Sequence, residues 1–156
     1  MRHQPTVFVG LLVVCVAGVP AIARAQSSER TLVEAARNAD TNGVRALLAQ
    51  GASVDAAEAD GATALHWASY RDDVDSADLL ISAGASVNAA NDLGVTPLWT
   101  ASQNGSAAMV RRLLEAGADP NRALLAGETP VMVAARSGTP DVVAQLLAEG
   151  ADVNAR

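Results

Sequence analysis

Side chains that perform acid–base, nucleophilic or metal chemistry are scarce in this sequence. Its 156 residues include two His, one Cys and no Lys, and of the His and Cys residues only His66 lies beyond residue 25. No Ser occupies a G-x-S-x-G nucleophile motif, and no group of His and Cys has the spacing of a metal site. The sequence therefore predicts no catalytic residue, no cofactor and no metal ion, and we expect that the protein is not an enzyme.

Four aspartates between residues 72 and 78 are the remaining candidate metal ligands. Asp72, Asp73, Asp75 and Asp78 lack the D-x-[DN]-x-[DN]-G spacing of a calcium loop, and a helix would scatter them around its axis. Acidic residues in the first turn of a helix interact favourably with the positive end of the helix dipole. We therefore interpret these residues as a solvent-exposed helix start and not as a calcium site.

Composition and charge restrict the classes of partner. Half of the residues are apolar but only 3% are aromatic, which favours thin layers of Ala, Leu and Val over one thick aromatic core. All eleven basic residues are Arg, and the 17 acidic residues outnumber them to give a net charge of −6. Binding to a phosphate backbone requires clustered cations. Nucleic acid is therefore not an expected partner.

The start of the chain, residues 1–25, forms a separate segment. Arg2 and His3 precede an apolar run at residues 7–19, and Ala23-Arg24-Ala25 follows it. This order is typical of a cleaved secretory signal peptide. The alternative is an uncleaved membrane anchor, but the run is shorter than the ~20 residues of a spanning helix. We therefore predict a signal peptide at residues 1–25 and an exported mature chain, periplasmic or secreted, without Cys and without membrane contact.

Beyond the leader, the sequence repeats with a constant period. The period is carried by Gly-Ala pairs at 51–52, 84–85, 117–118 and 150–151, and by Ala35, Ala68, Ala101 and Ala134. Its length of about 33 residues lies in the range that is the mark of a solenoid. We predict one array over residues 26–156, with repeats at about 27–59, 60–92, 93–125 and 126–156.

Within each repeat, the order of local signals predicts two short helices and a loop. A Gly followed two residues later by Thr precedes the first helix. In the last two repeats Pro97 and Pro130 occupy the first helical position, where a missing N–H costs nothing. Gly105 and Gly138 end this helix after about two turns. A second helix runs to the Gly-Ala pair, and the Asn-, Asp- and Gly-rich segment after it predicts a hairpin-like finger.

These units resemble the ankyrin repeat. The motif G-x-T-P-L-H-x-A appears as Gly61-Ala-Thr-Ala-Leu-His-Trp-Ala, Gly94-Val-Thr-Pro-Leu-Trp-Thr-Ala and Gly127-Glu-Thr-Pro-Val-Met-Val-Ala, and G-A-D-x-N closes each unit. The resemblance covers residues 28–156 and implies an all-α solenoid of four repeats, each a helix-turn-helix plus a finger. It also implies a structural role for His66, because in the family this His bonds to the motif's Thr and ties neighbouring repeats together. Leu124 departs from the pattern, since an Asp usually shapes the finger there.

The resemblance further implies where a partner binds, because the first helices and the fingers of ankyrin repeats line a concave binding face. Equivalent positions of successive repeats lie side by side on one face of a solenoid. Three columns result: Glu34, Trp67, Thr100 and Val133; Arg37, Tyr70, Gln103 and Arg136; and Asn38, Arg71, Asn104 and Ser137. These columns vary between repeats while the packing columns stay constant, and aromatic and Arg side chains dominate interface energetics. The predicted partner-binding residues are Trp67, Tyr70, Arg71, Gln103, Asn104 and Arg136 on the helices, with Leu93 and Leu125 on the fingers.

The predicted function is non-catalytic binding of a protein partner on this face. Packing of Trp67 and Tyr70 over the adjacent helix is the alternative explanation of the two aromatic residues. Two other functions stay open: an accessory segment of a larger exported enzyme whose catalytic domain lies beyond residue 156, and a structural spacer. The last repeat is as apolar as an internal one, although a terminal repeat needs a polar outer side. We therefore expect that the array is truncated at its C-terminus or that a partner covers that end.

Overall fold

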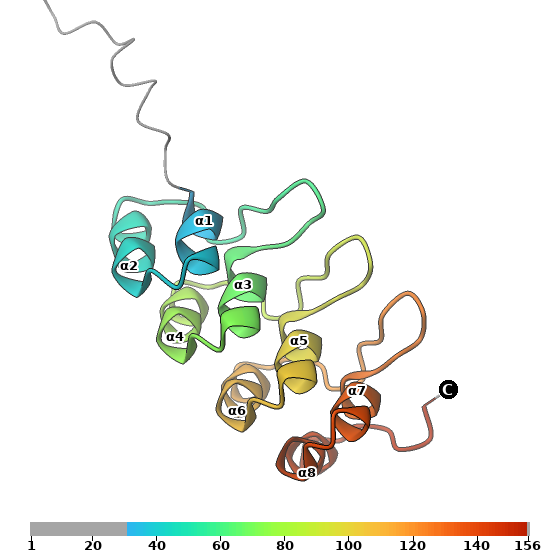
Figure 1. Ribbon diagram of the computed structural model, residues 1–156. Helices are drawn as coiled ribbons and strands as arrows, with labels where there is room; N and C mark the ends of the chain where they lie inside the picture. Colours follow the sequence, from blue (N-terminus) through green and yellow to red (C-terminus); the bar gives the residue numbers. More distant parts are fainter. Residues whose placement is uncertain (1–30, 156) are drawn as a thin grey trace, which may run out of the picture.

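The computed structural model describes residues 31–155, and there it contains eight α-helices and one isolated β-bridge, between Ala57 and Thr63 (Figure 1). The helices are α1 (Leu32–Arg37), α2 (Thr41–Ala49), α3 (Ala64–Arg71), α4 (Val74–Ser82), α5 (Pro97–Asn104), α6 (Ala107–Glu115), α7 (Pro130–Arg136) and α8 (Pro140–Ala148). The predicted all-α fold is confirmed. The predicted signal peptide at residues 1–25 lies outside the described residues.

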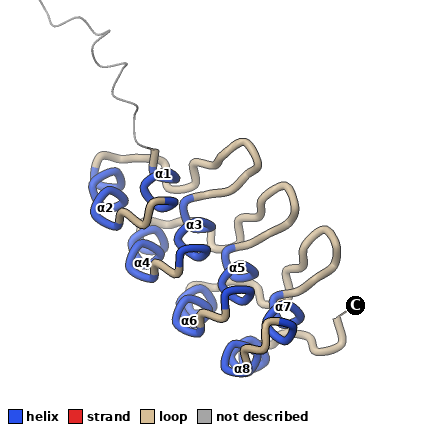
Figure 2. The backbone as a smooth tube through the Cα atoms, in the orientation of Figure 1, coloured by secondary structure: helices blue, strands red, loops and turns tan. Residues whose placement is uncertain are grey.

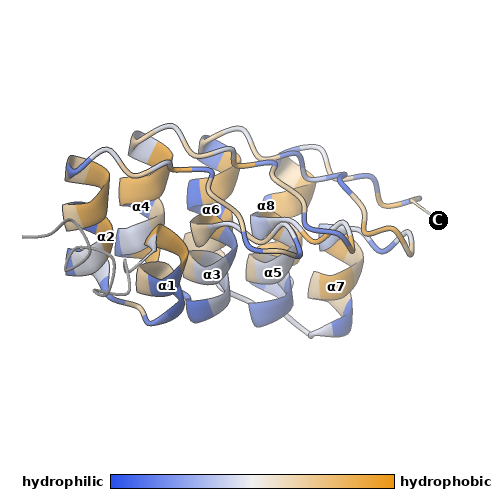
Figure 3. Ribbon diagram, turned by 90° about the horizontal axis from the view of Figure 1, so that it is seen from above, coloured by the Kyte–Doolittle hydropathy of each residue, from blue (hydrophilic) through white to orange (hydrophobic). Residues whose placement is uncertain are grey.

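The helices form two parallel rows. In the first row α1 packs against α3, α3 against α5 and α5 against α7, while α2, α4, α6 and α8 form the second row behind it (Figures 1 and 3). Each helix also contacts the other helix of its own pair. The long loops that join one pair to the next all project to the same side (Figure 2). This is the solenoid of helix pairs and fingers that the period of the sequence predicts.

The first-row helices begin at the Thr that the sequence pattern marks. Thr31 and Glu34 form a capping box, in which each side chain accepts a hydrogen bond from the other residue's backbone N–H. Thr96 accepts from the N–H of Trp99 at 3.1 Å, and Pro97 follows as the first residue of α5. These local bonds satisfy N–H groups that a helix leaves unpaired at its start. The helices of the first row therefore begin where the sequence predicts.

The second-row helices begin at short polar side chains. Asp73 accepts from the N–H of Ser76 at 3.0 Å, and Ser106 accepts from the N–H of Met109 at 3.2 Å. Thr139 stands at the equivalent position before α8 but forms a different bond, since its hydroxyl donates to the carbonyl of Ala134 at 3.0 Å. Among the second-row helices, α8 is thus the one whose cap departs from the expected pattern.

The core consists of columns of small and aliphatic side chains that run through the whole stack. Alanines fill the contacts between first-row helices, and leucines fill those between the rows. The completely covered members of these two columns are Ala35, Ala68, Ala101 and Ala134, and Leu80, Leu113 and Leu146. Because Ala carries only one methyl group, the first-row helices approach each other closely. No pair of helices buries its apolar side by itself.

Each finger closes by the same backbone bonds. Glu58, Asn91 and Leu124 each donate an N–H to the carbonyl four residues later. A Gly with positive φ follows in each finger, and at Gly94 the φ is +80°. A Cβ at Gly94 would lie 2.9 Å from the backbone nitrogen of Leu125 in the next finger. Successive fingers therefore pack too closely for a side chain at this position.

The Asn of the closing motif joins successive repeats. Asn88 donates to the carbonyl of Gly117 at 3.0 Å and accepts from the N–H of Asp119 at 2.8 Å. Asn121, the equivalent residue of the next repeat, makes the same two bonds to Gly150 and Asp152 at 3.0 and 2.7 Å. One amide side chain thus satisfies both a donor and an acceptor of the following loop. The motif is a hydrogen-bonded joint between repeats.

We predict that Leu113→Ala lowers the free energy of unfolding by ~2–5 kcal/mol, because it leaves a cavity in the completely covered leucine column. Leu125→Ala is the matched control: Leu125 is 81% exposed, so the same truncation should change the free energy by less than ~0.5 kcal/mol. Urea unfolding followed by circular dichroism measures both. Equal losses in the two variants would contradict the assignment of the core.

Candidate functional site

The eight residues predicted to bind a partner all lie on the first-row helices or the fingers. They are distributed as Trp67, Tyr70 and Arg71 on α3, Gln103 and Asn104 on α5, Arg136 on α7, and Leu93 and Leu125 on two fingers. Tyr70 is 55% exposed, Leu93 67% and Leu125 81%. Trp67 is half-buried, and the other four are exposed. The structure therefore places seven of the eight at the surface of the first-row helices or the fingers, with Trp67 partly covered.

Trp67 is the centre of an ordered side-chain cluster. Its indole N–H donates to a carboxylate oxygen of Glu58 at 2.8 Å. The guanidinium carbon of Arg37, from α1, lies 4.5 Å from the centre of the indole, and Arg37 also forms an ion pair with Glu58. The Tyr70 ring meets the indole edge-on, with ring centres 5.8 Å apart and an angle of 85° between the planes. Side chains from two helices and a finger thus hold the indole in place.

Arg71 and Asn104 bond to the C-terminal ends of preceding helices. Arg71 Nε donates to the carbonyl of Arg37 at 2.8 Å. Asn104 Nδ2 donates to the carbonyl of Tyr70 at 3.0 Å and to that of Ser69 at 3.3 Å. Carbonyls in the last turn of a helix lack the usual partner within that helix, so the side chains cap the neighbouring repeat. The sequence did not reveal this structural role for two of the predicted binding residues.

Gln103 and Arg136 present polar groups on the same side. The Gln103 side chain is exposed and forms no hydrogen bond within residues 31–155. Arg136 is exposed and forms an ion pair of 2.9 Å with Glu128. Because an exposed ion pair contributes little to stability, the guanidinium of Arg136 remains open to exchange with a partner.

The column that contains Trp67 was expected to line the binding face along its whole length. This expectation was wrong for Thr100 and Val133, which are buried. Thr100 is 6% exposed and donates its hydroxyl to the carbonyl of Thr96 at 3.2 Å, while Val133 is completely covered. The column lies where each first-row helix meets its neighbour. A side chain as long as Trp reaches the surface from this position, whereas the shorter Thr and Val stay beneath it.

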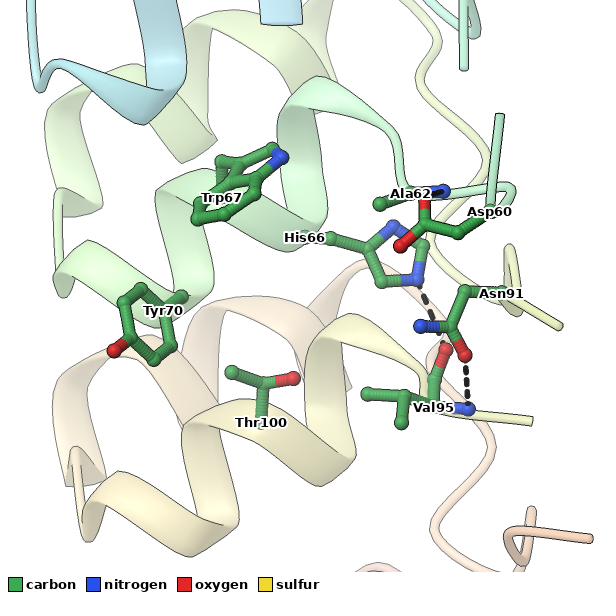
Figure 4. A pocket seen from close by; sticks show the side chains of 8 residues that line it. All are labelled: Asp60, Ala62, His66, Trp67, Tyr70, Asn91, Val95 and Thr100. Carbon is green, nitrogen blue, oxygen red and sulfur yellow. Dashed lines mark hydrogen bonds between the residues drawn. The ribbon is translucent and has the colours of Figure 1, made fainter. Parts of the chain in front are cut away.

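His66 joins the second repeat to the third. Its Nδ1 accepts the backbone N–H of Thr63 at 3.1 Å and lies 2.9 Å from the Thr63 hydroxyl, and its Nε2 lies 3.0 Å from the carbonyl of Val95 (Figure 4). An N–H only donates and a carbonyl only accepts, so the ring is neutral with its proton on Nε2. The structural role implied by the resemblance is confirmed. Burial lowers the pKa of His66 below its ordinary 6.5, against the opposing effects of the Val95 bond and of Asp60.

A groove of about 270 Å³ opens beside this histidine, between α3 and α5 (Figure 4). It is lined by Asp60, Ala62, His66, Trp67, Tyr70, Asn91, Val95 and Thr100. Two of these residues, Trp67 and Tyr70, are among the predicted binding residues. The sequence also placed Asn91 on the finger side of the same face, but it did not single out Asp60, which lies in the finger before that of Asn91. The position of Asp60 directly before Gly61 was the available signal.

Three of the four aspartates considered as calcium ligands have separate roles. Asp72 accepts a hydrogen bond from the hydroxyl of Ser106, and Asp73 caps α4. Asp78 forms an ion pair of 2.8 Å with Arg112 of the next repeat. Within residues 31–155, no three His, Cys, Asp or Glu side chains are grouped to hold a metal ion. The carboxylates of Asp72, Asp73 and Asp78 stabilise helix ends and junctions between repeats.

Comparison with known families gives one match. The family model for ankyrin repeats matches three times, at residues 9–91, 32–124 and 71–156. The comparison with individually curated proteins gave no match.

The lowered pKa of His66 predicts a pH dependence of stability. Above pH 6.5 the ring is neutral in both the folded and the unfolded chain, so its contribution is fully present. Below 6.5 the unfolded chain binds a proton that the folded chain does not, so stability falls until the pH reaches the lowered folded pKa. We expect the difference in urea-unfolding free energy between the wild type and His66→Gln to be smaller at pH 5.5 than at pH 7.5.

The carboxylates of the protein also titrate in this pH range, but they are common to the wild type and His66→Gln. Their contributions therefore cancel in the difference between the two proteins. A difference that stays constant between the two pH values would contradict the neutral buried imidazole.

Proposed function

Because the chain belongs to the ankyrin-repeat family, whose repeats are generic protein-binding modules, we propose that it binds a protein partner through one defined surface. This surface, called the binding face below, consists of the exposed side of α1, α3, α5 and α7 together with the fingers. It contains all eight predicted binding residues. The partner is a protein, and we assign it no nucleic-acid component because the basic residues are outnumbered by acids.

The observation that carries this proposal is the ordered aromatic cluster on α3. Tyr70 is 55% exposed and rests edge-on against Trp67, whose ring is held by Glu58 and Arg37. Binding normally costs conformational entropy because side chains must be immobilised. A cluster that is already held in place loses less on binding, and aromatic residues supply most of the energy at many interfaces.

The fingers extend the binding face with apolar groups. Leu93 and Leu125 are both largely exposed, and the N–H of Leu125 donates to the carbonyl of Leu93 at 3.1 Å. The two fingertips are therefore joined and present their leucines together. Exposed apolar groups that lie together mark surfaces that another molecule covers.

We assign no reaction to this part of the chain. Both ring nitrogens of His66 are engaged in hydrogen bonds within the fold, so the imidazole is not available as a general base. This agrees with the family, because ankyrin repeats are typically non-catalytic.

We further propose that the chain is exported to the periplasm or secreted. The support is the signal-peptide pattern of residues 1–25, namely a cationic start, an apolar run and small residues around Arg24. Among the residues described, no helix has the length and apolar character required to cross a membrane.

We predict that Trp67→Ala combined with Tyr70→Ala weakens capture of the partner by about thirtyfold or more, the effect of losing one strong interface residue. The bait is the mature chain, residues 26–156, and the sample is the exported protein fraction. The matched control is Arg111→Ala with Glu149→Ala, a pair of exposed residues on or beside second-row helices. We expect the wild type and the control to retain proteins that the aromatic variant does not retain.

Circular dichroism and urea unfolding show whether the aromatic variant is folded. If the folded aromatic variant retains the same proteins as the wild type, the binding face is not where the partner binds. Tyr70→Ala alone gives a second check, because this exposed ring can be removed without opening the core.

A further inference from the structure

The groove between α3 and α5 combines a carboxylate, an amide and an aromatic wall (Figure 4). Trp67 and Tyr70 stand on one side, and Asp60 and Asn91 stand on the other, in successive fingers. Thr100 and Val95 form the floor toward the next repeat. These groups come from two repeats, so the groove exists only where the repeats stack.

Asp60 gives the groove a negative charge that the protein does not neutralise there. One carboxylate oxygen accepts the N–H of Ala62 at 3.0 Å, and no described residue donates a hydrogen bond to the other. Figure 4 shows that second oxygen on the side of the groove. None of the eight lining residues is positively charged, because His66 is neutral in its hydrogen-bonded form. An exposed carboxylate beside a neutral wall attracts a cation.

Asn91 adds a donor beside this carboxylate. Its side-chain oxygen accepts the N–H groups of Leu93 at 3.0 Å and Val95 at 2.9 Å. Its amide nitrogen donates to no described residue and is turned toward the groove in Figure 4. Such a group binds a backbone carbonyl of an entering peptide.

On the opposite side of α3, a carboxylate and an aromatic ring already bind a cation. There the guanidinium of Arg37, from α1, lies 4.5 Å from the centre of the Trp67 ring and forms an ion pair with Glu58. The groove, on the side of α5, repeats the arrangement with Asp60 as the carboxylate and the Trp67–Tyr70 pair as the aromatic wall. The cation is the component that is missing from this second arrangement.

We propose that this groove binds an arginine side chain presented by an extended segment of the protein partner. The inference rests on the proposed protein-binding function and specifies what the partner must carry. The guanidinium donates to the second oxygen of Asp60 and lies against the Tyr70 ring, while Asn91 donates to a carbonyl of the same segment. Arginine fits better than lysine because its planar, weakly hydrated group stacks on aromatic rings.

Other occupants leave groups of the groove unsatisfied. An apolar side chain would remove water from Asp60 without replacing its hydrogen bond, which is unfavourable. An acidic side chain would be repelled by the same carboxylate. The charge and the aromatic wall together therefore select a cationic, planar group.

The test uses the mature chain labelled with ¹⁵N and the peptide acetyl-Ala-Ala-Arg-Ala-Ala-amide, whose only charge is the guanidinium. The matched probe replaces Arg with citrulline, which has nearly the same shape and no charge. Titration followed by NMR measures the dissociation constant from the shifts of the Trp67 indole and the Ala62 and Val95 amides. We expect binding of the arginine peptide to be about fivefold tighter, the ratio of an exposed ion pair at the strong end of its range.

Two variants assign that difference to the groove. Asp60→Asn keeps the oxygen that accepts from Ala62 and should bring the arginine peptide to the affinity of the citrulline peptide. Asp92→Asn removes the same charge from the neighbouring finger, outside the groove lining, and should have little effect.

Several results would overturn the proposal. They are equal binding of the arginine and citrulline peptides, no shifts at the groove resonances, or an Asp60→Asn variant that binds the arginine peptide like the wild type. A lysine peptide that binds as tightly as the arginine peptide would overturn the assignment to arginine. Failure here is distinct from failure of the proposed function, because a partner captured through Trp67 and Tyr70 with unchanged affinity for Asp60→Asn would keep the function and reject this ligand.

Discussion

The close packing of each helix pair against the pairs before and after it is the interaction on which the structure depends. The alanines of the first-row helices are completely covered, and so are the leucines between the rows. A single helix pair cannot bury these alanines and leucines by itself, so the stability of the fold arises from the interfaces between repeats. The hydrogen bonds of Asn88 and Asn121 then set the position of each loop relative to the next. Packing supplies the free energy, and these amides supply the register.

The same packing creates the candidate binding groups at junctions. Trp67 is held by Arg37 from the repeat before it, and the groove beside it is completed by Asn91 and Val95 at the boundary with the repeat after it. Asn104 likewise bonds to the end of the preceding first-row helix. Side chains that differ between repeats therefore do not act as independent units. Their chemistry depends on which neighbour the stack places beside them, and this is why the second and third repeats carry a groove that is specific to their sequences.

The sequence predicted the features that depend on local signals and on the period. Thr96 with Pro97 and Ser106 identify helix starts because caps are bonds between residues a few positions apart. The period also assigned all eight predicted binding residues to the first-row helices and the fingers, where the structure has them. The period did not predict how far each side chain is buried. Thr100 belongs to the same column as Trp67, yet it is buried. A column fixes the direction of a side chain, whereas exposure depends on its length and on what covers it.

The charge of the groove could not be predicted from the period of the sequence, because it depends on whether His66 carries a second proton. His66 accepts from Thr63 and lies against the Val95 carbonyl, an arrangement that requires the neutral ring. A protonated ring would stand beside Asp60 and offset its charge, but it would also place an N–H against the N–H of Thr63. Burial opposes that state further by lowering the pKa of His66. The bond that ties the second repeat to the third thus also leaves the carboxylate of Asp60 without a cation. The structural role of His66 and the proposed binding role of the groove are linked at this junction, because the proton position that the fold requires determines the charge that the groove presents.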